Sequence, residues 1–498
     1  MGIVIKQSFW NSIWAYVGVG IGFINTLVLR PAFFTDSQIG IVTTITGNAL
    51  MLAPFVALGM PSTYIRYFAE LKDNPALKTK VLSLQFSLIF TANILICLIA
   101  FFGFEWIKEI YIDKSPEYVK YIYASVLIMV LFSLFMQMHS FSRSMFNSVF
   151  PGFLKETFLR IGNLVLILLF SWNILSFDEL VNGLICSYLI SSISLGVYIL
   201  FVQKIRLSID IFSVPSTWLQ KIYKIGSFNF LMAGCNSIYN NVSIAMIPAI
   251  LGSSATGVYG ICLYIGIIIE LPKRSMLQII TPILAQEFKK NNFKEIEILY
   301  QKSSINLGVI GLLFLIGVIT NLNDLFLLIP NGEIYSAGFY VVVGIAVAKI
   351  IGMIFSFNSE LLYYTKYYKY NIYLFIIISF LIVGLNYILL PRIGINGAAV
   401  AFIISTVLFS LTKFIFIKVK FNMTPFTPKH VPLLVYSGIT FVIFWFLPIN
   451  TSPLFNIIVR SIGISVVFIT VVYISKISAD INGLIKVNFK KYLKINLP

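Results

Sequence analysis

Three charged residues lie inside one long apolar stretch and share a face of the helix that this stretch predicts. Glu270, Lys273 and Arg274 occupy positions i, i+3 and i+4 in the last third of the stretch 255–280, so their side chains are neighbours on a helix. Charge at membrane depth is costly and usually marks a pathway or a partner within the helical bundle. Two interpretations stay open: a cationic site facing a central cavity, and a self-neutralised cluster that reaches the cytoplasmic surface.

A single lysine stands in the middle of another apolar stretch. Lys349 occurs within "YVVVGIAVAKIIGMIFSF", which contains no carboxylate. A lysine at the centre of a membrane span cannot easily extend to the surface, so the position favours a cavity where an anion or water compensates its charge.

Three arginines stand at or within other apolar stretches. Arg30 ends the first stretch on the outer side, and Arg66 follows the second stretch in "GMPSTYIRYFAE". Each is a candidate substrate-binding residue, and each also fits an ordinary anchor at the membrane interface. For Arg460, in the last stretch, pairing with a lipid phosphate and binding of a second part of a substrate both stay open.

Polar or small residues form two stripes along apolar helices. Both stripes use spacings of seven, four and three residues, which place their members on one helical face. The glycines fit close helix packing, whereas the asparagines of the second stripe, with Asn236 and Asn240 at its centre, fit the lining of a wet cavity better. The first stripe consists of Asn11, Gly18, Gly22 and Asn25, and the second of Asn229, Asn236, Asn240 and Ser243.

No catalytic or metal-binding pattern appears. The sequence has no GxxxxGK[ST] phosphate loop, no Gly-x-Ser-x-Gly elbow and no His-Glu-x-x-His pair. The four cysteines lie within apolar stretches, and the two histidines, His139 and His430, have no ligand partner nearby in sequence. We therefore expect no enzymatic activity, no cofactor and no metal site.

The composition defines the elements that must position these residues. Hydrophobic residues make up 58% of the 498 residues and charged residues only 11%, which is typical of an all-α polytopic membrane protein. Fourteen transmembrane helices are predicted, with boundaries good to a few residues. They are roughly 9–29, 39–60, 81–103, 119–138, 157–173, 181–202, 225–247, 255–280, 303–322, 336–357, 370–390, 394–417, 431–448 and 454–475.

Basic residues predict the orientation of these helices. Most of the 36 lysines and arginines fall on one side if both termini are cytoplasmic, and this cytoplasmic set includes Lys155, Arg160 and Lys413. The same bias explains the net charge of +17 without nucleic acid as a partner.

The sequence also contains an internal repeat. "TDSQIGIV" at 35–42 matches "GSSATGVY" at 252–259, and "NGLICSYLIS" at 182–191 matches "NGAAVAFIIS" at 396–405, with offsets of 217 and 214. We therefore predict two six-helix lobes in a parallel repeat, with a substrate path between them. The expected domains are the N-terminal lobe 1–202, an amphipathic cytoplasmic linker 203–223, the C-terminal lobe 224–420, and two further helices with a basic tail, 421–498. A second interfacial helix is expected at 284–302.

This plan resembles the polysaccharide-transport branch of the MOP (multidrug/oligosaccharidyl-lipid/polysaccharide) superfamily. The resemblance covers nearly the whole chain and rests on "DSQIGIV", "GMPSTYIRYFAE", "ATGVYG", "ITPILAQEF" and "GINGAAVAF". It implies a MATE-like fold and a flippase of the Wzx type, which moves an undecaprenyl-pyrophosphate-linked oligosaccharide across the bacterial inner membrane. Rocking of the two halves would give alternating access, and the cations Lys349, Lys273 and Arg274 would hold the pyrophosphate.

The resemblance leaves related functions and partners open. A capsular or teichoic polysaccharide exporter and a peptidoglycan-precursor flippase belong to the same superfamily, although the latter carries several arginines inside its first two spans. A drug/cation antiporter usually has twelve spans and an acidic residue in the N-terminal half, and a glycan polymerase normally has a large periplasmic loop. The implied partners are the lipid-linked oligosaccharide, membrane lipids, a polysaccharide polymerase, glycosyltransferases, and a coupling ion, H⁺ or Na⁺.

Overall fold

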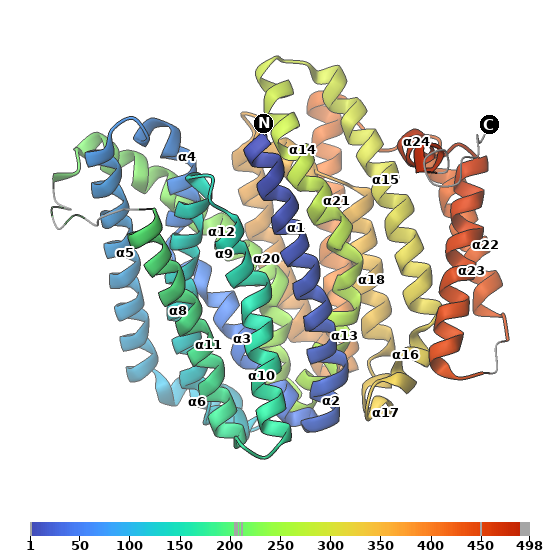
Figure 1. The fold of residues 1–498 in the computed structure, drawn as a ribbon, viewed down its shortest axis with the longest axis horizontal. Coiled ribbons are helices and arrows are strands. Elements are labelled where there is room, and N and C mark those ends of the chain that lie inside the picture. Colours follow the sequence, from blue (N-terminus) through green and yellow to red (C-terminus); the bar gives the residue numbers. More distant parts are fainter. Residues whose placement is uncertain (1, 204–207, 209, 211–212, 449–450, 489–498) are drawn as a thin grey trace. The chain divides into compact units, whose positions relative to one another are not determined.

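The described part of the chain is built from helices. The computed structural model describes residues 2–203, 208, 210, 213–448 and 451–488, and all regular structure in these residues is helical (Figure 1). Ten helices or continuous helical runs are long and apolar enough to cross a membrane. The predicted all-α, multi-pass class is therefore confirmed for these residues.

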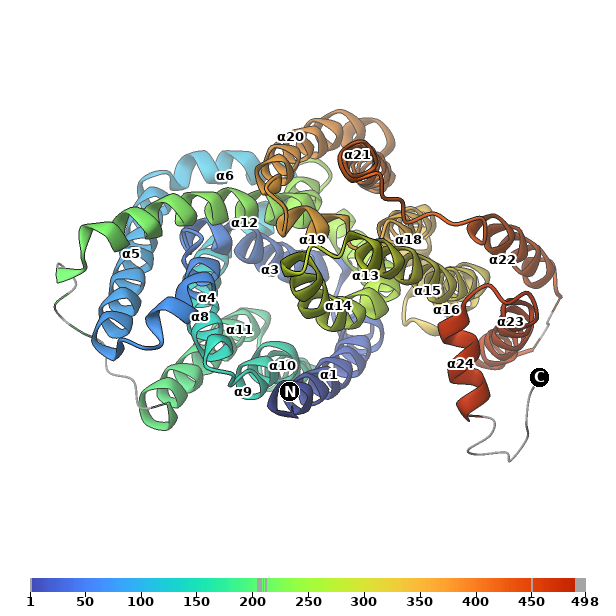
Figure 2. The ribbon, with the colours of Figure 1, turned by 90° about the horizontal axis from the view of Figure 1, so that it is seen from above.

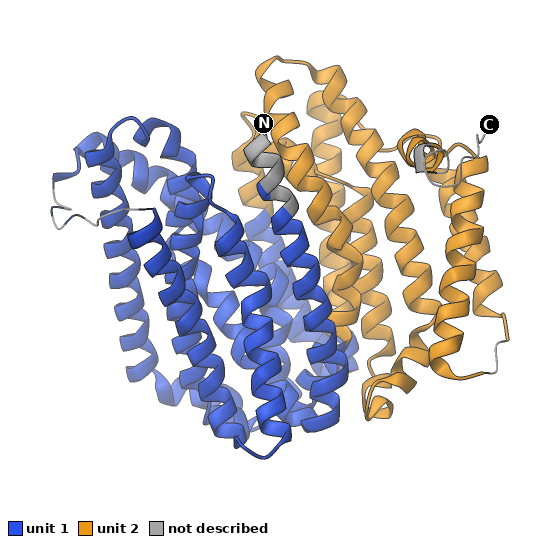
Figure 3. Ribbon diagram, viewed as in Figure 1, with its two compact units in different colours: residues 1–261, 375–397 blue, residues 262–374, 398–498 orange. Residues whose placement is uncertain are grey.

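The chain divides into two compact units (Figure 3). Unit 1 comprises residues 1–261 and 375–397, and unit 2 comprises residues 262–374 and 398–498. These units differ from the lobes expected from the sequence repeat, because the start of the expected second lobe belongs to unit 1. The repeat lobes themselves stay a prediction.

Unit 1 contains the helices of the N-terminal half together with two later ones. Three of its segments, η1, η2 and η3, are π-helical. Its elements are α1 (Gly2–Phe23), η1 (Ile24–Leu29), α2 (Arg30–Phe33), α3 (Asp36–Val56), α4 (Met60–Leu71), α5 (Pro75–Phe102), α6 (Phe104–Ile112), α7 (Pro116–Val119), α8 (Ile122–Ser144), α9 (Val149–Phe153), η2 (Leu154–Phe158), α10 (Leu159–Ser171), α11 (Phe177–Val197), η3 (Tyr198–Val202), α12 (Ser216–Ile250), the first part of α13 (Ser253–Ile267) and most of α20 (Tyr368–Ile393).

Unit 2 contains the helices that carry most of the charged candidate residues. Its elements are the end of α13, η5 (Ile268–Glu270), α14 (Leu271–Lys289), α15 (Phe293–Thr320), α16 (Leu322–Leu328), α17 (Gly332–Ser336), α18 (Phe339–Ile354), α19 (Asn358–Tyr363), the start of α20, α21 (Ile395–Phe421), α22 (His430–Trp445), α23 (Pro453–Ile474) and α24 (Ala479–Asn488).

The predicted spans can be compared with these helices one by one. Each of the fourteen overlaps a helix or a continuous helical run. Ten of the runs are long and apolar enough to cross a membrane, while α18 and α22 are apolar but shorter. The number of fourteen crossings therefore stays a prediction.

The segment expected as an interfacial helix at 284–302 is not a separate helix. Helix α14 continues to Lys289, and α15 begins at Phe293. The break arises because the Asn292 side chain caps α15 by accepting a hydrogen bond from the Glu295 amide at 3.4 Å. The prediction of one helix was wrong. The amphipathic pattern continues on both sides of the turn, so the pattern alone does not show the break.

The expected linker 203–223 is described only in part. From Ser216 onward it forms the first turns of α12, a helix of 35 residues. Several residues of 203–215 lie outside the described part of the chain, so the expected amphipathic linker stays a prediction there.

The turn between α14 and α15 allows a direct test of orientation. In the variant Lys294→Cys, we expect the exposed new cysteine to be labelled only from the cytoplasmic side, because basic residues concentrate on that side. The measurement is modification by a membrane-impermeant maleimide in intact cells and in inverted vesicles. Labelling in intact cells would contradict the predicted topology.

Several helices begin where the sequence supplies a cap. Thr35 and Gln38 form a capping box at the start of α3, and Ser176 and Glu179 form another at the start of α11. Near the charged candidates, Pro272 prevents a regular helix from continuing, because it has no N–H and its ring clashes with the preceding turn. The chain instead makes a 3₁₀ turn at Ile268–Glu270 before α14 begins.

In unit 1, α12 packs closely along α3. A Cβ on Gly47 would overlap the Ile244 side chain, and a Cβ on Gly234 would overlap the Phe55 ring. The Ser237 hydroxyl donates to the Leu50 carbonyl at 3.0 Å. Small residues therefore let the two helices approach closely, as is typical of helix packing in membranes.

The two glycines of the sequence repeat lie in one reciprocal contact inside unit 1. A Cβ on Gly40 would overlap the carbonyl of Ser253, and a Cβ on Gly257 would overlap the carbonyl of Asp36. Positions 36 and 40 correspond to positions 253 and 257 at the same offset of 217. The two matching turns therefore pack against each other with their roles exchanged, and glycine is required at both close approaches.

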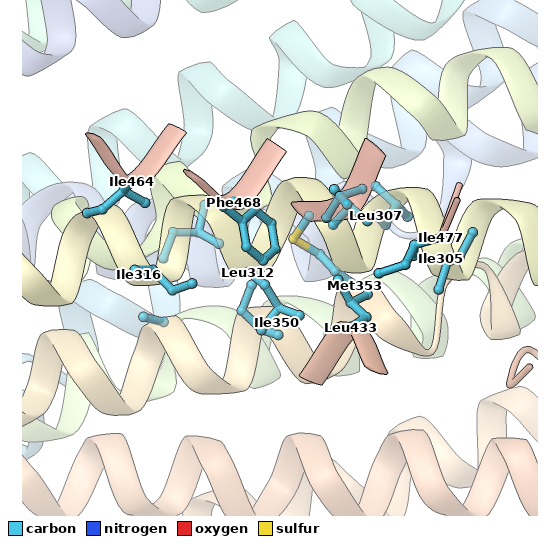
Figure 4. Packing of buried hydrophobic residues seen from close by; sticks show 14 of the residues in the cluster. Ile305, Leu307, Leu312, Ile316, Ile350, Met353, Leu433, Ile464, Phe468 and Ile477 are labelled. Atoms are coloured by element: carbon cyan, nitrogen blue, oxygen red, sulfur yellow. The ribbon is translucent and has the colours of Figure 1, made fainter. Parts of the chain in front are cut away.

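In unit 2, one apolar cluster joins α15 and α18 to the last two long helices (Figure 4). Leu312 and Ile316 of α15 pack with Ile350 of α18 and with Phe468 of α23. Figure 2 shows α22 and α23 side by side next to α15. The two additional C-terminal helices are therefore part of the hydrophobic core of unit 2.

Candidate functional site

The central feature of the candidate site is an ion pair between Lys349 and Glu270. The Nζ atom of Lys349, on α18, lies 2.7 Å from Oε2 of Glu270, in the 3₁₀ turn, and the two side chains are 12% and 24% exposed. The ammonium group also lies 5.1 Å from the centre of the Phe402 ring, a favourable cation–π distance. The expectation that Lys349 has no carboxylate partner was wrong, because its partner lies 79 positions away in sequence.

Lys273 is held by a backbone carbonyl. It stands in the first turn of α14 and donates from Nζ to the Gly352 carbonyl of α18 at 2.6 Å. Arg274 is exposed and acts electrostatically on Glu270. The three residues at 270, 273 and 274 therefore do not form a closed cluster, since Glu270 pairs with another helix.

The structure adds two charged residues that the sequence analysis did not select. Lys413, on α21, is 2% exposed, donates to the Ser359 hydroxyl at 2.5 Å and lies 3.4 Å from the centre of the Phe409 ring. Glu360, on α19, acts electrostatically on both Lys413 and Lys273. Lys413 had been assigned to a cytoplasmic segment because it lies near other lysines, yet it is buried among the helices of unit 2.

Together these residues form what we call the unit-2 charge cluster. It contains four cations, Lys273, Arg274, Lys349 and Lys413, and two carboxylates, Glu270 and Glu360. An excess of cations among apolar helices needs anions or water for compensation. The cluster is therefore suited to hold an anionic group such as a phosphate.

The other predicted site residues belong to unit 1. Asn236 and Asn240 are exposed neighbours on α12, and the Asn240 amide donates to the Asn236 carbonyl at 2.8 Å. Arg30 is half-buried at the start of α2, and Arg66 is exposed on α4. Substrate binding by these four residues stays a prediction.

The stripes of polar residues are partly explained by packing. Asn229 donates to the Thr63 hydroxyl at 3.0 Å, and the Ser243 hydroxyl donates to Oδ1 of Asn386 at 3.1 Å. In the first stripe, Asn11 donates to the Ser148 hydroxyl at 2.7 Å. The ends of the second stripe are thus occupied, and only its centre is exposed.

The role of Arg460 is settled by its contacts. Its guanidinium pairs with Asp324 of α16, and the Asn456 amide donates to the same carboxylate at 3.0 Å. The side chains of Arg460 and Asp324 are only 14% and 12% exposed. Arg460 therefore fastens α23 to α16, so neither of the two functions left open by the sequence is needed to explain it.

Among the described residues, no group of three or more His, Cys, Asp or Glu side chains is placed to hold a metal ion.

These helices define a multi-pass membrane protein, and unit 2 carries a cluster of charged side chains. No protein-family model matches the chain, and no curated protein sequence matches it. Solved structures do match its fold. The lipid II flippase MurJ, in an inward closed conformation, aligns with a TM-score of 0.76 and 13% identity over 94% of this chain and 99% of its own.

Two transporters of the MOP superfamily also share the fold. An inward-facing multidrug resistance MATE family transporter aligns with a TM-score of 0.61 and 15% identity, over 84% of this chain and 98% of its own. A superfamily member from Pyrococcus furiosus, described by a binding pocket of reverse polarity, aligns with a TM-score of 0.55 and 15% identity, over 84% and 95%. At these identities the likeness establishes that the chain shares the fold of these proteins.

Proposed function

We propose that the protein is a flippase for a lipid-linked oligosaccharide. Its substrate is an undecaprenyl-pyrophosphate-linked O-antigen unit or a similar polysaccharide repeat unit, moved from the inner to the outer leaflet of the bacterial cytoplasmic membrane by alternating access. The observation that carries the proposal is the excess of cations in the unit-2 charge cluster, in a chain with a MOP-type fold.

The physical reason lies in the cost of moving a diphosphate through a membrane. A diphosphate that leaves water needs cations that compensate its charge. Outward movement of negative charge also runs with an inside-negative membrane potential, which supplies about 2.3 kcal/mol per charge per 100 mV. A coupled H⁺ or Na⁺ gradient would add to this driving force.

The proposal is tested with purified protein in proteoliposomes. The substrate is a fluorescent undecaprenyl-pyrophosphate oligosaccharide placed in both leaflets, and a membrane-impermeant quencher is added outside. Molecules of the inner leaflet should become accessible to the quencher only when the protein is present. Imposed proton, sodium and potential gradients, applied one at a time, identify the driving ion. Equal rates with empty liposomes would contradict the proposal.

Lipid II is the second candidate substrate. It is favoured by the alignment with MurJ, which covers nearly the full length of both chains. The same proteoliposomes supplied with lipid II distinguish the two candidate substrates. Both lipids carry a pyrophosphate, and they differ in the sugars attached to it. Faster movement of lipid II than of O-antigen or capsular units would identify a peptidoglycan-precursor flippase.

We also expect transport without chemical change of the substrate, since the sequence contains no nucleophile–base pair or nucleotide loop. Mass spectrometry of the lipid after transport should recover the intact molecule. A shortened or extended glycan, formed by the wild-type protein but not by a variant of one of its residues, would instead identify an enzyme.

A further inference from the structure

Helix α6 of unit 1 follows a membrane span directly and lies across the end of that span. Only Gly103 separates α6 from α5, and α5 is long and apolar enough to cross a membrane. A Cβ on Gly103 would lie only 2.7 Å from the Ile99 carbonyl oxygen, so glycine permits the sharp turn. Figure 1 shows α5 running up the page with α6 at its lower end, and Figure 2 shows α6 lengthwise from above.

The length of α5 places α6 at a surface of the hydrocarbon core. Lys80 is the last charged residue of α5, and Phe102 is the last residue of the helix. The segment between them spans about 33 Å at a rise of about 1.5 Å per residue, and the hydrocarbon core is about 30 Å thick. With Lys80 at one membrane surface, α6 therefore begins at the opposite one, which the basic residues predict to be the outer surface.

One face of α6 is fixed against the rest of unit 1. Tyr111 is buried, and its hydroxyl donates to the Ala245 carbonyl of α12 at 3.4 Å and accepts from the Asn48 amide of α3 at 3.4 Å. The ring centre of Tyr111 also lies 4.9 Å from that of Tyr118. These contacts set the rotation of α6 about its own axis, and they thereby decide which of its residues are exposed.

The exposed sides of α6 differ in chemistry. Trp106 and Ile110, four residues apart, are 77% and 57% exposed. Glu105 and Lys108 form an ion pair at 2.9 Å, and Glu109 is exposed beside them. At about 100° per residue, the middle of the ion pair lies roughly 150° around the helix from the middle of Trp106 and Ile110. One side of α6 is therefore apolar and the opposite side is charged.

The apolar side of α6 continues the exposed side of a membrane span. Ile99 and Phe102, in the last turn of α5, are exposed, as are Trp106 and Ile110 in α6. Exposed apolar side chains thus follow one another from the span into the short helix. Tryptophan is enriched where a membrane meets water, because its ring is suited to the level of the lipid headgroups. An apolar side opposite a charged side is typical of a helix that lies in the plane of this interface.

We propose that α6 binds the lipid surface by lying in the plane of the membrane interface. Trp106 and Ile110 insert between the lipid chains, and the Glu105–Lys108 pair faces the water. The helix contains two glutamates and one lysine, so its insertion should not require anionic lipids. This inference concerns how unit 1 contacts the membrane, and it does not depend on the proposed function.

The test is tryptophan fluorescence of the purified full-length protein in lipid nanodiscs. The chain has six tryptophans, so the signal of Trp106 is taken as the difference between the wild type and Trp106→Phe. Lipids brominated near the headgroup should remove the largest part of this signal, lipids brominated near the chain end a smaller part, and iodide in the water the smallest. Replacing neutral lipids by anionic ones should leave this order unchanged.

The matched control moves the tryptophan by one residue. Glu105→Trp is combined with Trp106→Phe, which places a tryptophan about 100° further around the helix, on the charged side. The signal of this new tryptophan should be reduced more by iodide than by brominated lipids. Equal quenching of the two tryptophans by iodide would overturn the proposal, because both sides of α6 would then face water.

Ile110→Trp keeps the test decisive if Trp106→Phe does not fold. This substitution adds a tryptophan on the apolar side, so the added signal should follow the order expected for Trp106. An added signal that neither brominated lipids nor iodide reduce would overturn the proposal, since protein, such as a second copy of this chain, would then cover this side. Strongest quenching by lipids brominated near the chain end would also overturn it, because α6 would then lie inside the hydrocarbon core.

Discussion

Lys349→Ala should reduce the transport rate by about tenfold or more, because it removes a buried cation from the unit-2 charge cluster and leaves the Glu270 carboxylate to repel the substrate phosphates. The measurement is the rate in proteoliposomes, or the amount of glycan at the cell surface, at equal protein level in the membrane. Lys349→Arg should retain more activity, since it keeps the charge. Lys302→Ala, at an exposed position of α15, is the matched control and should have little effect.

The ion pair with Glu270 also allows a structural role to be separated from a binding role. Losing one partner of a buried pair is costly, whereas replacing both with apolar residues is often tolerated. The double variant Lys349→Met, Glu270→Met should therefore regain stability but not transport. If it transports normally, Lys349 is a structural partner of Glu270, and the phosphate must be bound elsewhere. Glu270→Gln alone should be milder than loss of Lys349.

Arg460→Ala should cause the largest loss of stability, because it leaves the buried Asp324 carboxylate without its cation. Breaking a buried ion pair from one side costs about 3–5 kcal/mol. The measurement is thermal unfolding in detergent, where α22 and α23 should become susceptible to protease at a lower temperature than in the wild type.

Two further variants show whether this effect comes from the ion pair. The double variant Arg460→Met, Asp324→Met should recover most of the lost stability. Lys108→Ala is the surface control, because its pair with Glu105 is exposed and contributes little. If Arg460→Ala melts like the wild type, the pair does not hold α23 in place.

The positions of the helices could be predicted because helix formation in a membrane depends on the local run of apolar residues. A long apolar run must form a helix in a membrane, since every backbone polar group needs an internal partner there. Errors arose where polar residues interrupt the pattern. The segment around Asn292, for example, was predicted as one helix and contains a helix break.

The candidate site could be predicted only in part for a different reason. The sequence analysis selected Lys349 and Lys273, because isolated charges in apolar stretches are conspicuous. It could not find the partner of Lys349, since spacing along one helix says nothing about which helix lies opposite. It also missed Lys413, which stands near other basic residues and was counted with them.

The reciprocal contact of Gly40 and Gly257 has a consequence for how the protein can change. In a homodimer of two six-helix chains, such an isologous contact would place every substitution on both sides of the symmetry axis at once. In this single chain each side has its own codon. Asp36 and Ser253 already differ while both glycines are kept, so one side can diverge while the other preserves the close approach. A single chain can therefore change one of the two matching turns without changing the other.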